Sequence, residues 1–195
     1  DNERPLFIVG PGAYARLEGA AVLAKIAAAA KSLGVVKDGW NGLCILQSAA
    51  SRVAALDIGF VPANGGLDTA AMANGGADVI YNLGADEVEI APGPFVIYQG
   101  SHGDRGAHRA DVILPGAAYT EKSGTYANTE GRVQLTSKAA FPPGDAREDW
   151  AILRELSARL GKQLPYDNLQ QLRAEMYKAA PQLAILGTQD PGALD

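Results

Sequence analysis

The sequence predicts an α/β fold, with an open, mainly parallel, Rossmann-like sheet and flanking helices. Up to residue 115, short apolar runs alternate with segments of helical periodicity, as in doubly wound sheets. The runs lack the regular polar positions of a strand with one solvated face, which indicates a buried parallel sheet. Glycine, proline or serine follows most of them, as expected where loops gather at one sheet edge. The predicted strands cover residues 6–9, 43–46, 79–83, 95–98 and 111–114.

An alanine-rich amphipathic segment between the first two strands predicts a helix. Leu23, Ile26 and Leu33 fall on one face, and charged residues fall on the other. Gly34 stands where a left-handed residue commonly ends a helix. The helices predicted in this part of the chain cover residues 16–34, 48–58 and 68–74, the last beginning near Asp68 or Gly66.

The interval between the third and fourth strands conflicts with a parallel arrangement. It contains only about ten residues, 85–94, whereas a parallel crossover usually takes a dozen or more. Either a very short helix connects the two strands, or one of them is misassigned. The strand order therefore stays open.

After residue 115 the composition changes. Residues 116–136 are polar, contain glycine and lack a sustained period, so we expect an ordered loop or an irregular hairpin. Asp145 and Glu148 form a D-x-x-E pattern that predicts a capping box. Two helices are predicted next, over residues 150–160, ended by Gly161, and over residues 168–180, stopped by Pro181.

The length of 195 residues suits one domain with a helical extension. We expect the α/β domain over residues 1–140, the extension over residues 141–183 and a disordered tail over residues 184–195. The first residues lack an initiator methionine and a signal-peptide pattern, which favours a fragment of a longer protein. A processed mature chain is the alternative.

Charge and composition exclude several classes of protein. A net charge of −5 and a pI near 5.1 argue against nucleic-acid binding, which requires a basic surface. The sequence contains no run of 18 apolar residues, so it predicts no membrane-spanning helix. One cysteine and two histidines supply neither a disulfide framework nor a four-cysteine cluster. Cys44 lies in an apolar strand, where a free thiol usually acts as a small hydrophobe.

A motif in the centre of the chain resembles a known family. The strand Ala110-Asp111-Val112-Ile113-Leu114-Pro115 is followed at residues 121–134 by the pattern E-K-x-G-T-x-x-N-x-E-G-R-V-Q. The motif is similar to one found in molybdopterin oxidoreductases, such as formate dehydrogenases and nitrate reductases. We call residues 121–134 the signature segment.

Four further segments resemble the large iron–sulfur subunits of respiratory complex I, the NADH-quinone oxidoreductase, in its bacterial and mitochondrial forms. They are Val9-Gly10-Pro11-Gly12-Ala13, the residues LDIGFVP at 56–62, NLGADE at 82–87 and YQGSHGD at 98–104. The resemblance implies a carboxy-terminal scaffold that holds no molybdenum cofactor, whereas the amino-terminal region carries the iron–sulfur clusters that pass electrons from NADH toward quinone.

The same resemblance implies partners and a location. We expect contacts with the missing amino-terminal region and with other peripheral-arm subunits, on the cytoplasmic side of the bacterial inner membrane. A detached domain of a true molybdopterin enzyme is the alternative, and a free-standing nucleotide-binding module is a third possibility. Truncation predicts an exposed apolar patch where the missing region would pack.

Two pairs of residues form a candidate remnant pocket. Gly10 and Gly12 lie in a strand-to-helix turn that could cradle phosphate, but Pro11 removes a donor and the full glycine pattern is absent. A plain tight turn is therefore favoured. His102 and Asp104 follow the fourth strand, where ligands of open sheets normally lie. No nucleophile stands beside them at a recognisable spacing, so we expect loop hydrogen bonds or contacts with the missing amino-terminal region, and no catalytic or metal-binding residues.

The signature segment is predicted to be structural. Its glycines permit positive φ or close backbone approach, its Thr and Asn fix turns, and its charges pair with neighbours. A retained pterin contact is the functional alternative. The residues concerned are Glu121, Gly124, Thr125, Asn128, Glu130, Gly131 and Arg132.

Overall fold

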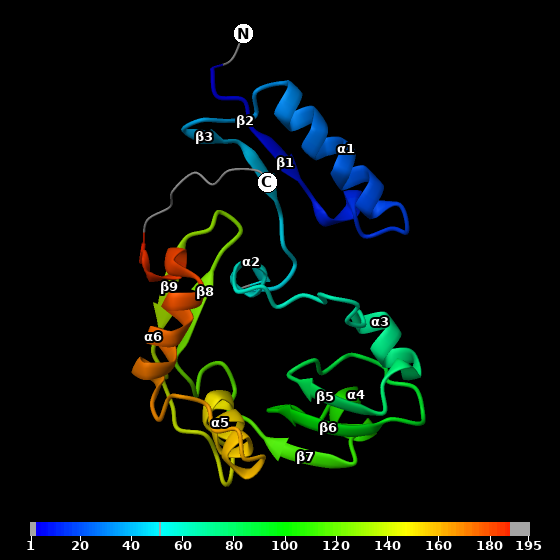
Figure 1. Cartoon of the computed structure of the whole chain (residues 1–195), viewed down its shortest axis with the longest axis vertical. Coiled ribbons are helices and arrows are strands. Elements are labelled where there is room, and N and C mark those ends of the chain that lie inside the picture. Colours follow the sequence, from blue (N-terminus) through cyan, green and yellow to red (C-terminus); the bar gives the residue numbers. More distant parts are fainter. Residues whose placement is uncertain (1–2, 51, 188–195) are drawn as a thin grey trace. The chain divides into compact units, whose positions relative to one another are not determined.

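The computed structural model describes residues 3–50 and 52–187. These residues form two compact units, which are described separately. Of the described residues, the first unit draws on 3–50, 52–59, 125–135 and 180–187, and the second on 60–124 and 136–179. Figure 1 labels the helices and strands. Both units combine parallel strands with helices, which confirms the predicted α/β class.

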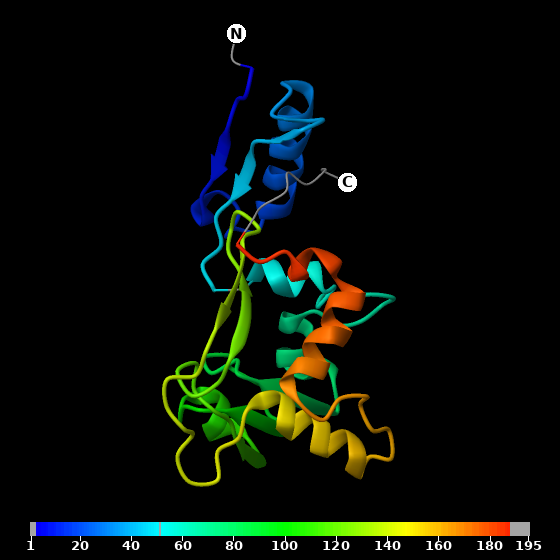
Figure 2. The ribbon, with the colours of Figure 1, turned by 90° about the vertical axis from the view of Figure 1, so that its left-hand side faces the viewer.

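A parallel strand pair and one long helix form the centre of the first unit. Strand β1 (Phe7–Val9) pairs with β4 (Leu43–Ile45). Helix α1 (Gly19–Ser32) connects them and lies beside the pair in Figures 1 and 2. The smaller elements are the 3₁₀ turn η1 (Pro11–Ala13), the antiparallel strands β2 (Val36–Lys37) and β3 (Trp40–Asn41), and helix α2 (Arg52–Asp57).

Helix α1 ends where the sequence predicts. Gly34 has a φ of 67°, which a residue without a Cβ adopts readily. The Val35 N–H then donates to the Ala30 carbonyl oxygen at 2.8 Å, and both residues are fully buried. The predicted start at residue 16 is three residues too early, because α1 begins at Gly19.

Three parallel strands form the sheet of the second unit, in the order β5-β6-β7. The short helix α4 (Arg105–Arg109) connects β6 to β7. Helix α3 (Thr69–Ala71) precedes the sheet, and the Asp68 side chain caps it by accepting the Ala71 N–H at 2.7 Å. The strands are β5 (Val79–Leu83), β6 (Phe95–Gly100) and β7 (Val112–Pro115), and the π-type turn η2 (Met72–Gly76) leads into them.

The short crossover between β5 and β6 resolves the conflict seen in the sequence. Both strands are where the sequence predicts them, and they are parallel, with Val79 opposite Phe95. Residues 84–94 make the connection as an irregular loop rather than as a short helix. Both of the explanations offered from the sequence are therefore wrong.

The parallel strands lie in two sheets rather than in one open sheet. β1 and β4 form one sheet, and β5, β6 and β7 form another. Apolar runs identify buried strands, but they do not state which strands are neighbours.

The signature segment lies mostly in a hairpin, which is one of the two forms predicted for residues 116–136. Strands β8 (Gly124–Ala127) and β9 (Val133–Thr136) form a two-stranded sheet, visible in Figure 2. Gly131 in the connecting loop has a φ of 82°, which confirms the need for glycine at this position.

The predicted capping box at Asp145 and Glu148 is wrong. Helix α5 (Asp149–Arg159) has Glu148 at its N-cap position without a side-chain cap, and Asp145 lies outside the helix. The Glu148 carboxylate instead accepts the Trp150 Nε1–H at 3.0 Å and pairs with Lys138 at 3.6 Å. Because the Glu148 carboxylate makes these contacts, it does not form the predicted capping box.

The last two predicted helices are confirmed. Gly161, with a φ of 72°, follows the end of α5. Helix α6 (Leu169–Ala179) ends before Pro181, which begins the 3₁₀ turn η3 (Pro181–Ala184). Among the described residues, no helix is long and apolar enough to cross a membrane. Residues 188–195 of the predicted tail lie outside the described residues.

Candidate functional site

A cleft lies at the carboxyl ends of β5 and β6 in the second unit. Its volume is about 340 Å³. Leu83 and Gly84 line one side and Gly100 lines another, so the cleft occupies the sheet edge where ligands of open α/β sheets bind. Its polar lining comes from Asp86, Gln99, Ser101, His102, Tyr119, Lys122 and Asp149.

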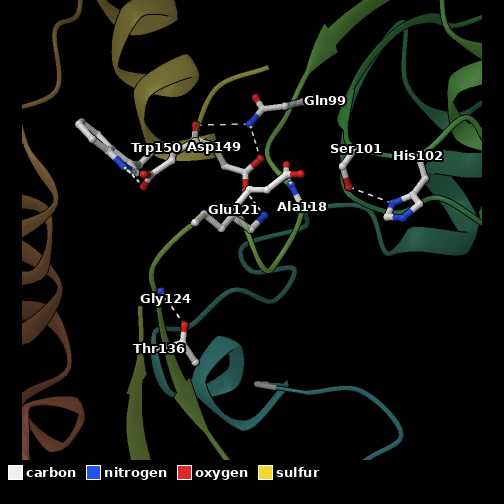
Figure 3. A network of polar contacts seen from close by, with 11 residues as sticks. Gln99, Ser101, His102, Ala118, Glu121, Gly124, Thr136, Asp149 and Trp150 are labelled. Atoms are coloured by element: carbon white, nitrogen blue, oxygen red, sulfur yellow. Dashed lines mark hydrogen bonds and ion pairs between the residues drawn. The ribbon is translucent and has the colours of Figure 1, made fainter. Parts of the chain in front are cut away.

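Gln99 and Asp149 form the polar centre of this cleft. Gln99 is fully buried, and its Nε2 donates to the Asp149 Oδ1 at 2.9 Å and to the Asp149 carbonyl oxygen at 3.3 Å. Its side-chain oxygen accepts a hydrogen bond from the Tyr81 hydroxyl. Figure 3 shows the Gln99 and Asp149 side chains pointing toward each other. The buried amide therefore has its hydrogen bonds satisfied, as stability requires.

Lys122 pairs with the other oxygen of the same Asp149 carboxylate. Its Nζ forms an ion pair with the Asp149 Oδ2, and the two side chains are 30% and 27% exposed. Asp149 is the first residue of α5, where the helix dipole favours a negative charge. One carboxylate thus ties the signature segment to β6 and α5.

Tyr98 fixes a second group of polar residues beside the cleft. Its hydroxyl donates to the Asp86 carboxylate and lies 3.0 Å from the His102 carbonyl oxygen. Burial, followed by the hydrogen bond to Asp86, raises the pKa of Tyr98 to about 12. The phenol therefore stays protonated at neutral pH and acts as a hydrogen-bond donor.

The close packing of this tyrosine depends on a glycine. A Cβ on Gly100 would lie 2.1 Å from the Tyr98 hydroxyl oxygen. No real contact is that short, so a side chain at Gly100 would force Tyr98 out of its place.

The two pairs of the predicted remnant pocket fall in different units. Gly10 and Gly12 lie at η1 in the first unit, where the Ala13 N–H donates to the Gly10 carbonyl oxygen at 3.0 Å. His102 lines the cleft of the second unit, and its Nδ1 lies 2.9 Å from the Ser101 Oγ (Figure 3). Asp104 stands at the N-cap position of α4, where its carbonyl oxygen accepts the His108 N–H at 3.1 Å.

In the first part of the signature segment, a carboxylate and a strand end are held by local hydrogen bonds. The Glu121 Oε2 accepts the Ala118 N–H at 2.9 Å. The Gly124 N–H donates to the Thr136 Oγ1 at 3.0 Å, also visible in Figure 3. Thr125 follows in β8.

In the hairpin loop, one asparagine organises the turn. The Asn128 Oδ1 accepts the N–H groups of Glu130 and Arg132, both at 3.0 Å. Arg132 pairs with Glu130 at 3.6 Å and donates to the Gly187 carbonyl oxygen at 2.6 Å. The Asn128 contacts are local, whereas the contact between Arg132 and Gly187 joins residues 55 positions apart in the sequence.

The sequence analysis missed the residues at the centre of the network. Gln99, Tyr81 and Asp149 are far apart in the sequence, and no motif joins them. A signal existed for Gln99, because it is a polar residue at the end of an otherwise apolar strand. Across the described residues, no three histidine, cysteine or acidic side chains gather as a metal site would require.

Comparison with known proteins gives the context of this geometry. The family model of molybdopterin oxidoreductases matches residues 1–159. The chain is 48% identical over 93% of its length to the mitochondrial 78 kDa subunit of NADH-ubiquinone oxidoreductase from Candida albicans. It is 50% identical over 80% of its length to the same subunit from Neurospora crassa. It is 44% identical over 97% of its length to the mitochondrial NADH dehydrogenase (ubiquinone) iron-sulfur protein 1 from Solanum tuberosum.

The chain spans 25%, 21% and 25% of the lengths of these three relatives. The family match, by contrast, covers most of the chain, including both parallel sheets and the signature segment. The chain belongs to the molybdopterin oxidoreductase family.

Proposed function

We propose that this chain is the carboxy-terminal scaffold of the large iron–sulfur subunit of a respiratory NADH-quinone oxidoreductase. The observation that carries the proposal is an identity of 42–50% over most of the chain to relatives named as subunits of that enzyme. The complete protein would pass electrons from NADH toward quinone, and this chain would contribute folded structure to it.

The composition supports a structural role for this part. Iron–sulfur clusters are held by several cysteine thiolates, whereas this chain has a single cysteine, Cys44. The clusters would therefore belong to a region outside the chain. Within it, the paired Lys122 and Asp149 lock the signature segment to the sheet, as a scaffold requires.

The proposed partners are the cluster-bearing region and other peripheral-arm subunits. The proposed location is the cytoplasmic side of a bacterial inner membrane, attached through the assembly. A tag on the natural protein tests both, because NADH-oxidising activity and membrane association are expected to copurify with it. Purification free of any such activity would contradict the proposal.

Metal analysis and absorbance spectroscopy test whether this chain holds no iron–sulfur cluster or molybdenum of its own. The purified chain, incubated with ferrous iron and sulfide and then desalted, is expected to show no cluster absorbance and only traces of iron and molybdenum. Stoichiometric iron or molybdenum, or turnover of NADH by the chain alone, would overturn the structural role.

A molybdenum enzyme is the second candidate, favoured by the family match and by the cleft at the sheet edge. The cleft does not fit a pterin dinucleotide, however. The lining of the cleft contains the carboxylates of Asp86 and Asp149, which would repel a pyrophosphate, and its one lysine, Lys122, is already paired with Asp149. The sequence of the complete gene separates the candidates, because a cysteine, selenocysteine or serine molybdenum ligand would favour the second one.

A further inference from the structure

On β6, the central strand of the sheet of the second unit, one face is packed and the other is partly open. Side chains alternate along each strand, so every second residue lies on the same face. On one face lie Val96 and Tyr98 of β6, which are 0% and 1% exposed, and Ile113 of the edge strand β7, which is 54% exposed. Helix α4 covers this face, since a Cβ on its Gly106 would lie 3.1 Å from the Tyr98 ring.

The opposite face carries apolar side chains that stay in contact with solvent. Val79 and Phe95 are register partners and are 59% and 47% exposed, and Val112 of β7 is 40% exposed. Tyr81 and Ile97, also register partners, are half-buried between them. We call these five residues the open face.

On β6, the open face ends before Gln99. Gln99 lies on the same face, since its register partners continue the series, and it is fully buried against Asp149 of α5. On β6 the amino-terminal part of this face is therefore the part left open, and on the edge strand β5 Leu83, the register partner of Gln99, is also 43% exposed. Parallel sheets are buried on both faces because helices cover each side, so a five-residue apolar surface of this kind implies a missing layer.

The dimensions of the open face fit one helix. Three strands about 4.8 Å apart place the outer strands about 10 Å from each other, and the three positions from Phe95 to Ile97 span about 10 Å along the strand. An α-helix is about 10 Å in diameter, and about 7 residues, or two turns, span 10 Å. The exposed acidic side chain of Asp78, just before β5, favours a basic residue at the margin of such a helix.

We propose that the open face is the docking site of an amphipathic helix supplied by the part of the same polypeptide that lies outside this chain. The relatives have about three quarters of their length outside the matched region, since the chain spans 25% of them. This inference rests on the proposed function in one respect: it takes the complete protein to be as long as those relatives. A helix with a narrow apolar stripe and a basic residue at one margin is the expected occupant.

Site-specific photo-cross-linking in the complete, natural protein tests the proposal. A benzoylphenylalanine replaces Phe95, which it resembles in shape, and a second variant carries it at the position of Val79. The matched control places it at Glu155 of α5, where the side chain is 63% exposed. After irradiation, the cross-linked peptides are identified by mass spectrometry.

Both open-face positions are expected to link to one helical segment outside the 195 residues, with a yield several-fold above that of Glu155. A link confined to the 195 residues, a link between two copies of the open face, or a link to another subunit would overturn the proposal. A yield no higher than that of the control would overturn it as well.

A pair of substitutions provides an independent measurement. In the complete protein, Phe95→Lys is expected to lower the melting temperature clearly more than Phe95→Leu does, because a charge would be buried under the helix. Equal melting temperatures of Phe95→Lys and Phe95→Leu in the complete protein would contradict the docking helix. Failure of the proposed function is read separately, by the absence of copurifying NADH oxidation.

Discussion

The carboxylate of Asp149 joins three segments of the second unit. It accepts a hydrogen bond from the fully buried Gln99 and an ion pair from Lys122, and it begins α5. Without this carboxylate, the Gln99 amide and the Lys122 ammonium would each lack a partner at a partly buried position. The loss of stability is then larger than for an exposed contact.

Asp149→Ala is expected to lower the free energy of unfolding by about 1–3 kcal/mol, because the Gln99 amide and the Lys122 ammonium lose their partner. The control is Glu155→Ala, which removes an exposed pair with Arg159 and should cost no more than about 0.5 kcal/mol. Urea unfolding of both variants measures the difference. Equal losses would show that the network does not stabilise the fold.

The raised pKa of Tyr98 predicts how stability depends on alkaline pH. The unfolded phenol loses its proton near pH 10, whereas the folded one holds it to about pH 12. Above pH 10 the unfolded state therefore binds fewer protons, and stability falls as the pH rises toward 12. In Tyr98→Phe this contribution is absent. Melting temperatures recorded from pH 8 to 12 should fall less steeply in the variant than in the wild type, and parallel curves would contradict the assignment.

At the scale of elements, β6 is the central strand of the three-stranded sheet, and it carries residues of both networks. Gln99 points to the side of α5, and Tyr98 to the side of α4. Gly100 ends the strand at the point where the Tyr98 ring passes closest to the backbone. The last position of β6 therefore has to be a residue without a side chain, in addition to pairing with the neighbouring strands.

Gly100→Ala is expected to destabilise the chain by about 1–3 kcal/mol, because its Cβ would overlap the buried Tyr98 hydroxyl. Gly103→Ala is the matched control, since a Cβ there has no neighbour within 4 Å and the backbone is not left-handed. The control should change stability by no more than about 0.5 kcal/mol. Thermal unfolding of both variants, followed by circular dichroism, measures the contrast. Similar melting temperatures would contradict the packing described for Tyr98.

At the scale of the whole molecule, the described residues include many large apolar side chains that are exposed to solvent. The sequence predicts such a surface from truncation, and the open face provides one. Contiguous apolar surface of this kind marks a place for another chain segment.

The chain by itself is expected to increase the fluorescence of a hydrophobic dye. The double substitution Val79→Lys and Phe95→Lys should reduce this signal while the far-ultraviolet circular dichroism stays the same, because both side chains are already exposed. Leu17→Lys is the control, since Leu17 is fully exposed in the other unit. Dye binding that is insensitive to the double substitution would place the apolar surface elsewhere.

The sequence by itself determined the class of the fold, the five parallel strands and the family. Strand positions follow from local apolar runs, and the turns at Gly34 and Gly131 follow from a backbone that only glycine adopts easily. These signals are local, so one sequence contains them in full. The motif of the signature segment is likewise a contiguous run of residues.

The tertiary structure alone decided which strands are neighbours and which polar residues meet. The contacts of Gln99 with Tyr81 and Asp149 span 18 and 50 residues of sequence, and pairing at such distances leaves no local periodicity. The same holds for Glu148, whose carboxylate bonds to Trp150 and Lys138 where local spacing predicts a cap. Competition among partners in three dimensions settles these contacts, because a side chain takes the partner that folding brings to it.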